Sequence, residues 1–152
     1  MNRFLLAILP LVCLAAGPVD APAPSSRFAA IDVMIDPKGQ PLAAWQIEFA
    51  AETGQVSLVG VESGEPGAYA KRPPYYDPAA LAGNRIILGD YSLDPAIPKT
   101  KIRVARLMLE IRGAAKPQYV TKLITAADPD GKAIPANVSV NDASQPRSGD
   151  KK

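Results

Sequence analysis

Histidine is absent from this chain of 152 residues, and cysteine occurs once, as Cys13. Zinc sites are built largely from Cys and His side chains, and a Ser-His-Asp triad needs a histidine base. The sequence therefore excludes the zinc and haem sites that use these ligands, together with histidine-based catalysis. No spacing among the acidic residues picks out a carboxylate pair for glycoside hydrolysis. We expect no cofactor, no metal site and no catalytic residue.

A strong net charge of either sign is also missing, because the chain has 17 Lys and Arg residues and 15 Asp and Glu residues. Nucleic-acid binding depends on neutralising phosphates, so this balance predicts no nucleic-acid partner. The 16 prolines and 11 glycines are spread along the chain and disfavour long helices. The hydrophobic share of 47% is too high for a disordered chain. Length and composition together predict one folded domain.

The N-terminus has the layout of a secretory signal peptide, with Arg3 ahead of an apolar run that ends near Ala16. About 13 apolar residues span roughly 20 Å as a helix, less than the ~30 Å of a bilayer core. Pro10 also interrupts the run. We predict a signal peptide over residues 1–15, cleaved after Ala15, and an extracytoplasmic location. Two alternatives stay open: a lipid anchor on Cys13, and an uncleaved segment that holds the chain at a membrane.

Composition divides the remaining chain into three parts. Residues 16–26 are rich in Pro, Ala and Ser and predict a linker, and residues 142–152 predict a polar tail. The domain between them, residues 27–141, contains no cysteine, and signal cleavage removes Cys13, the only cysteine of the chain. It must therefore fold on its hydrophobic core without a disulfide.

Apolar and polar residues alternate with a period of two through most of this domain, which is typical of half-buried strands. The predicted strands are Phe28–Asp36, Pro41–Ala51, Gln55–Glu62, Asn84–Leu93, Lys101–Arg112, Tyr119–Thr125 and Ala136–Val140. Lys101–Arg112 has a helix-forming composition, but Val104 and Ile111 do not fit helical spacing, so a strand is favoured. Residues 79–82 can form one helical turn. The predicted fold class is all-β: an immunoglobulin-like or jelly-roll-like β-sandwich of about seven to nine short strands.

The same alternation predicts which side chains form the core of the sandwich. Trp45 alternates with two further apolar residues and is interpreted as a core residue, although it is the one tryptophan of the chain. The predicted core is Ile31, Val33, Trp45, Ile47, Phe49, Leu58, Ile87, Val104, Leu107, Leu109 and Ile111. The acidic stretch Asp128–Lys132 lacks the ligand spacing of an EF-hand loop and predicts a β-turn.

Residues 69–78, YAKRPPYYDP, are the most unusual segment of the domain. Tyrosine and arginine dominate binding hot spots, and prolines restrict a loop before a partner docks. We predict that Tyr69, Arg72, Tyr75 and Tyr76 bind a partner. The alternative is that the tyrosines pack over one end of the sandwich. A second candidate surface is a flat mixed polar and apolar face formed by Gln46, Glu48, Met108 and Glu110.

Three stretches resemble the cohesin-like domain of cellulosomes and related bacterial surface proteins. These are Ala43–Gly60 (AAWQIEFAAETGQVSLVG), Asn84–Asp90 (NRIILGD) and Leu123–Val138 (LITAADPDGKAIPANV). Pro73–Ala82 has no obvious counterpart in that family. The resemblance implies a β-sandwich that binds an extracytoplasmic protein without catalysis. Because the superfamily includes carbohydrate-binding modules, a polysaccharide ligand is the alternative, and an envelope structural subunit is a third possibility.

Overall fold

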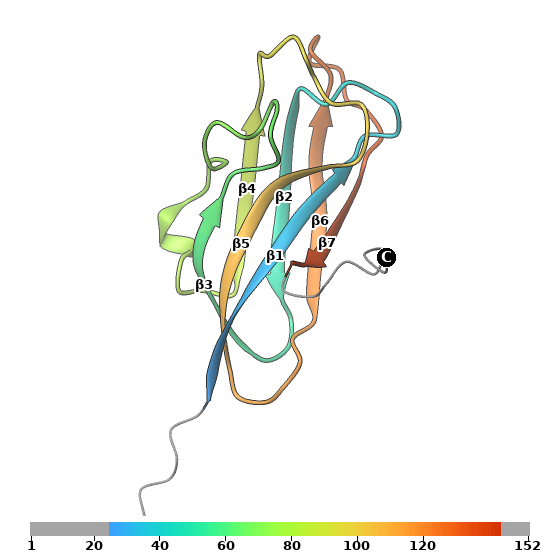
Figure 1. The fold of residues 1–152 in the computed structure, drawn as a ribbon. Coiled ribbons are helices and arrows are strands. Elements are labelled where there is room, and N and C mark those ends of the chain that lie inside the picture. Colours follow the sequence, from blue (N-terminus) through green and yellow to red (C-terminus); the bar gives the residue numbers. More distant parts are fainter. Residues whose placement is uncertain (1–24, 144–152) are drawn as a thin grey trace, which may run out of the picture.

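Seven antiparallel strands form two sheets in the computed structural model, which describes residues 25–143. The four-stranded sheet has the order β3-β5-β1-β7 and the three-stranded sheet the order β4-β2-β6 (Figure 1). The prediction of an all-β sandwich is confirmed. The predicted signal peptide, most of the linker and most of the polar tail lie outside the described residues. The strands are β1 Ser26–Asp36, β2 Ala44–Ala51, β3 Gln55–Glu62, β4 Arg85–Tyr91, β5 Ile102–Arg112, β6 Tyr119–Ala127 and β7 Asn137–Asp142.

Consecutive strands always belong to different sheets, so every connection crosses from one sheet to the other. The connections that follow β1, β4 and β6 meet at the upper end of the sandwich in Figure 1. Backbone hydrogen bonds tie them together there: Leu42 N–H donates to the Pro98 carbonyl at 2.9 Å and Ala43 N–H to the Ala127 carbonyl at 2.8 Å. The connections at this end are therefore linked to one another by backbone hydrogen bonds.

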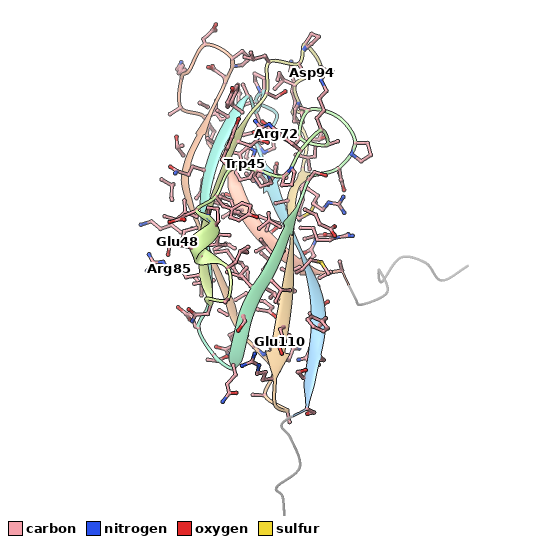
Figure 2. All side chains as sticks on the ribbon, turned by 90° about the vertical axis from the view of Figure 1, so that its left-hand side faces the viewer. Trp45, Glu48, Arg72, Arg85, Asp94 and Glu110 are labelled. Carbon is pink, nitrogen blue, oxygen red and sulfur yellow. The ribbon has the colours of Figure 1, made fainter. Side chains whose placement is uncertain are left out.

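The core lies between the two sheets, where the period-two pattern places it. The second half of strand β5 shows the alternation clearly, with Leu107, Leu109 and Ile111 fully buried and the residues between them partly exposed. This region is a strand and not a helix, as predicted. Figure 2 shows Trp45 inside the sandwich, while Glu48 and Arg85 point outward. Ten predicted core residues are buried: Ile31, Val33, Trp45, Ile47, Phe49, Leu58, Val104, Leu107, Leu109 and Ile111.

The prediction that the eleventh residue, Ile87, lies in the core is wrong. Its side chain is 44% exposed, whereas Ile86 and Leu88 on either side of it are buried. Three consecutive apolar residues leave the phase of a strand undetermined, and the register resolves it. Ile87 lies opposite Glu48 on β2, and both side chains face away from the core. The exposed face of β4 therefore carries Ile87, Gly89 and Tyr91.

The structure contains the two short turns that the sequence predicts. A 3₁₀ turn, η1 Pro78–Ala80, begins one residue before the helical turn expected at residues 79–82, because the Asp77 side chain accepts a hydrogen bond from Ala79 N–H and caps it. The Asp128 stretch is a turn, as predicted. Its carboxylate accepts hydrogen bonds from the N–H groups of Asp130 and Lys132, and Gly131 has φ +77°.

Candidate functional site

The connection between β3 and β4 closes one open side of the sandwich by bonding to the edge of each sheet. At the β3 edge, Leu58 N–H donates to the Gly83 carbonyl and Ala82 N–H donates to the Leu58 carbonyl, at 2.8 and 2.7 Å. At the β4 edge, Tyr75 and Gly89 exchange two backbone hydrogen bonds of 2.8 and 3.0 Å. Both edge strands therefore lose part of their unpaired backbone to this connection, and the tyrosine-rich segment is fixed against β4.

Tyr69 is a core residue, which corrects its prediction as a partner-binding residue. Its side chain is 1% exposed, and its hydroxyl donates to the Leu42 carbonyl at 2.6 Å. The Tyr69 ring meets Trp45 edge to face, with centroids 6.0 Å apart. Burial raises the pKa of the Tyr69 hydroxyl well above its usual range, and the charge of Asp90 raises it further. For this residue the packing alternative holds.

Tyr75 lies in the same segment but on the outside of the protein, with a side chain that is 59% exposed. Because it pairs with Gly89, it faces the same side of the sheet as Gly89 and as Tyr91, two residues farther along β4. Tyr91 is 53% exposed. The two ring planes are 12° apart and the ring centroids 6.4 Å apart. The fold therefore presents two nearly parallel tyrosine rings to solvent.

Arg72 holds this pair of rings in place. Its guanidinium carbon lies 4.1 Å from the centroid of the Tyr75 ring and 5.9 Å from that of Tyr91, within the range of cation–π attraction. One guanidinium nitrogen is 2.7 Å from the carboxylate of Asp90, which is 7% exposed and also accepts a hydrogen bond from Tyr91 N–H. Arg72 thus neutralises a buried carboxylate while its planar group covers a ring.

Tyr76, the last of the four predicted residues, is partly buried and packs against the hydrophobic core. The structure therefore separates the predicted set. Arg72 and Tyr75 lie together at the surface, Tyr69 lies inside, and Tyr76 lies between these two environments.

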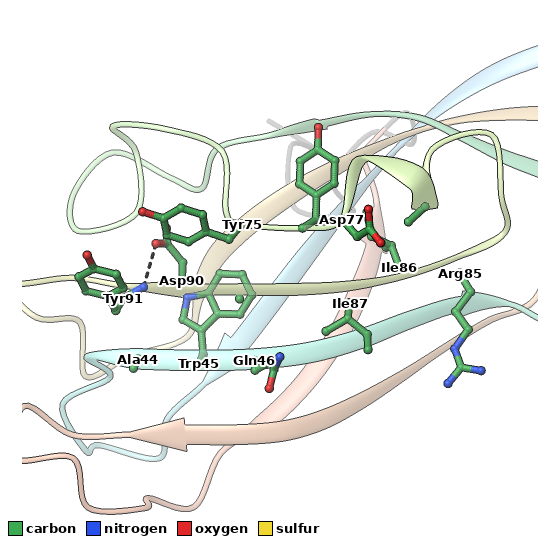
Figure 3. A pocket seen from close by; sticks show the side chains of 13 residues that line it. Ala44, Trp45, Gln46, Tyr75, Asp77, Arg85, Ile86, Ile87, Asp90 and Tyr91 are labelled. Carbon is green, nitrogen blue, oxygen red and sulfur yellow. Dashed lines mark hydrogen bonds between the residues drawn. The ribbon is translucent and has the colours of Figure 1, made fainter.

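Three hollows meet at Tyr91, which lines each of them. The largest, about 790 Å³, runs along β4 between β2 and the connection that contains Tyr75, and we call it the tyrosine groove (Figure 3). The second, about 400 Å³, lies between Arg72 and Asp94, and the third, about 480 Å³, extends from Tyr91 to the turn at Gly131. Among the residues that line the tyrosine groove are Gln46, Tyr75, Asp77, Arg85, Ile87 and Tyr91.

The groove combines aromatic and apolar surface with a few fixed polar groups. Arg85 is held by Glu48 at 2.9 Å, and Asp77 caps η1. The indole nitrogen of Trp45, which also lines the groove, is buried with no hydrogen-bond partner. Within residues 25–143, no group of three or more His, Cys, Asp or Glu side chains could hold a metal ion. The arrangement suits binding by ring contact and directed hydrogen bonds.

The second predicted surface, a flat face made of Gln46, Glu48, Met108 and Glu110, does not exist as one surface. The first two residues are on β2 and the last two on β5, and these strands belong to different sheets. Sequence reasoning overlooked Tyr91, which stands at the centre of the site. With β4 in its correct phase, the pattern from Ile86 to Tyr91 would have placed this tyrosine outside.

Family models, curated proteins and solved structures were all compared with this chain, and none of them matches it. The resemblance to cohesin-like domains therefore stays a prediction. In the part of the chain that the structure describes, no helix is long and apolar enough to span a membrane.

Proposed function

We propose that this chain is an exported, non-catalytic binding module whose tyrosine groove engages another protein outside the cytoplasm. One observation carries the proposal: Tyr75 and Tyr91, each more than half exposed, are fixed side by side where three hollows meet. The export signal predicted over residues 1–15 supports the location.

The composition of the surface supports a protein as the partner. Tyrosine and arginine are the residue types that dominate protein interfaces, and here Arg72 lies against both rings. Apolar side chains extend the surface at each end, with Ile87 44% and Leu93 91% exposed. An exposed apolar patch rimmed by charged groups is typical of an interaction site.

The way the rings are held also favours tight binding. Tyr75 is anchored by two backbone hydrogen bonds to Gly89, and Tyr91 belongs to strand β4. Little side-chain and loop entropy remains to be lost when a partner docks. The site is therefore organised before binding.

A polysaccharide is the second candidate ligand, and the nearly parallel rings are the observation that favours it. Tyrosine rings offer an apolar face to a sugar ring, and Gln46, Asp77 and Arg85 in the groove offer hydrogen-bonding groups to hydroxyls.

Capture from the extracytoplasmic fraction of the source organism tests both candidates. The wild-type chain, Tyr91→Ala and the matched control Val59→Ala, an exposed residue of the other sheet, are immobilised and incubated with the fraction. We expect the wild type and the control to retain a protein that Tyr91→Ala loses, and protease treatment of the fraction to abolish the signal. Loss after periodate oxidation of sugars, but not after proteolysis, would instead favour the polysaccharide. Equal retention by all three chains would contradict the proposed site.

A further inference from the structure

The tyrosine groove has the features of a site for a proline-rich chain. Proline-rich segments dock into grooves lined by aromatic rings, because their extended polyproline II conformation loses little entropy on binding. Tyr75 and Tyr91 supply two such rings with planes 12° apart, and both rings are held before binding. Hollows extend from Tyr91 in both directions along the sheet face, so an extended chain can cross the rings without a bend.

The protein itself contains a segment of this chemistry. Residues 18–24 read PVDAPAP, with three prolines in seven residues and one charge, Asp20. A chain of this composition favours polyproline II and spans about 19 Å from the first to the seventh residue at ~3.1 Å each. The groove follows β4 from Arg85 to Tyr91, which is about 20 Å at ~3.3 Å per residue. Arg85 lines the groove and Arg72 lies against the tyrosine rings, but each is already paired with a carboxylate, so the match rests on the rings and the length and not on charge.

The tyrosine pair cannot receive this segment from its own chain. Ser25 accepts a hydrogen bond from Gly113 N–H at the lower end of β1, whereas Tyr91 pairs with Ala44 near the upper end of the sandwich (Figure 1). The eleven residues of β1 separate these two levels by roughly 35 Å at ~3.3 Å per residue. Pro24 directly precedes Ser25, so Pro22 and Pro24 cannot reach the rings.

We infer that residues 18–24 of one copy bind the tyrosine groove of a second copy, so that the protein associates head to tail. This inference rests on the proposed function and names the partner as a second copy of the chain. The donating segment and the accepting groove are different surfaces, so the contact is heterologous and repeats from copy to copy.

Two variants separate the donor from the acceptor. The first is the double variant Pro22→Ala/Pro24→Ala, which alters the segment and leaves the groove intact. The second is Tyr91→Ala, which alters the groove and leaves the segment intact. Analytical ultracentrifugation of the exported chain is expected to show wild-type association that grows with concentration. Each variant alone associates at least about tenfold more weakly, as loss of a hot spot predicts. An equimolar mixture of the two variants forms a 1:1 dimer and nothing larger, because only one segment and one groove remain. Val59→Ala, on the other sheet, associates like the wild type.

A peptide of residues 16–26, titrated into the wild-type chain, gives a second readout that does not depend on the folding of a variant. It is expected to shift the NMR signals of Tyr75 and Tyr91 and to dissociate the assembly, whereas the same peptide with both prolines replaced by alanine does neither. A wild-type chain that stays monomeric, a mixture that fails to form the dimer, or a peptide without effect overturns the inference. If Tyr91→Ala nevertheless loses a different captured protein, the proposed function stands and only the self-association fails.

Discussion

The outer faces of the two sheets differ in the side chains that they expose and in how those side chains are paired. On the four-stranded sheet, Asp32 of β1 lies between Arg106 at 2.6 Å and Arg103 at 3.6 Å, and Glu110 pairs with Arg112 at 2.9 Å. On the three-stranded sheet, Ile87 and Tyr91 remain about half exposed beside a groove. On the first face Asp32 and Glu110 are paired within their own sheet, whereas the second face has exposed apolar side chains that line a groove.

This difference is the reason why we propose the three-stranded sheet as the binding face. The four-stranded sheet also exposes Phe28 and Val59, at 69% and 46%, but neither residue lines any of the three hollows at Tyr91. Single exposed apolar residues are common on monomeric proteins, whereas a hollowed cluster of them is typical of a binding surface.

Trp45→Ala gives the largest expected effect, because it removes a buried side chain that lines the tyrosine groove. The indole is 2% exposed and packs against Tyr69. We expect the free energy of unfolding to fall by about 3–5 kcal/mol through lost burial and a cavity. Urea unfolding followed by circular dichroism measures this change. A loss below about 1 kcal/mol would mean that the strand is out of phase and that the outer face has been misassigned.

A matched pair on β4 separates the inner side of that sheet from its outer side. Ile86→Ala is expected to cost about 2–4 kcal/mol because the residue is buried, and Ile87→Ala about 0.5 kcal/mol or less because it is exposed. Chemical denaturation of both variants provides the comparison. The reverse order of the two effects would place Ile87 in the core after all.

Asp32→Ala tests the ion pairs on the outer face of the four-stranded sheet. It leaves the guanidinium groups of Arg103 and Arg106 without their shared carboxylate. Asp32 is 7% exposed and accepts two hydrogen bonds from Arg106, at 2.6 and 3.2 Å. We expect a loss of about 1.5–3 kcal/mol, as for hydrogen bonds to charged groups. Glu110→Ala is the control, since its exposed pair with Arg112 should contribute at most about 1 kcal/mol. Equal effects would show that the Asp32 cluster is an ordinary surface ion pair.

Tyr69→Phe tests the anchor that fixes the connection between β3 and β4. Loss of the hydrogen bond to the Leu42 carbonyl should cost about 1–1.5 kcal/mol at neutral pH. Burial raises the Tyr69 pKa, so above about pH 10 the folded state keeps a proton that the unfolded chain has lost. The free energy of unfolding therefore falls as the pH rises above about 10.

In Tyr69→Phe that alkaline decline should be smaller, although not absent, because burial also raises the pKa of Tyr119. Thermal unfolding of both chains between pH 8 and 11 measures the difference. Parallel declines would show that Tyr69 titrates normally and is not buried.

Most of the fold could be predicted from the sequence, because a period of two is a local pattern. Residues 106–111 of strand β5 are a clear case, since their alternation fixes which side chains lie inside without knowledge of any neighbour. Strand β4 is the exception. Ile86, Ile87 and Leu88 are all apolar, and the side that each one faces depends on pairing with β2.

The site could be predicted only in part, because it depends on contacts between distant segments. Tyr69 and Tyr75 lie six residues apart in a segment without periodicity, and no local pattern distinguishes the buried ring from the exposed one. The pairing of Tyr75 with Gly89 decides it, and that pairing also brings Tyr91 alongside. Composition could identify the segment as unusual, but it could not reveal its second half on β4.

Tyr91→Ala, measured for both stability and binding on the same preparation, tests most directly whether the exposed tyrosines form the binding face. The free energy of unfolding should fall by less than about 1 kcal/mol, since the side chain is 53% exposed. Affinity for the captured partner should fall by at least about tenfold, as expected for a hot-spot residue. A large loss of stability with unchanged affinity of the folded protein would contradict this account and make Tyr91 a packing residue.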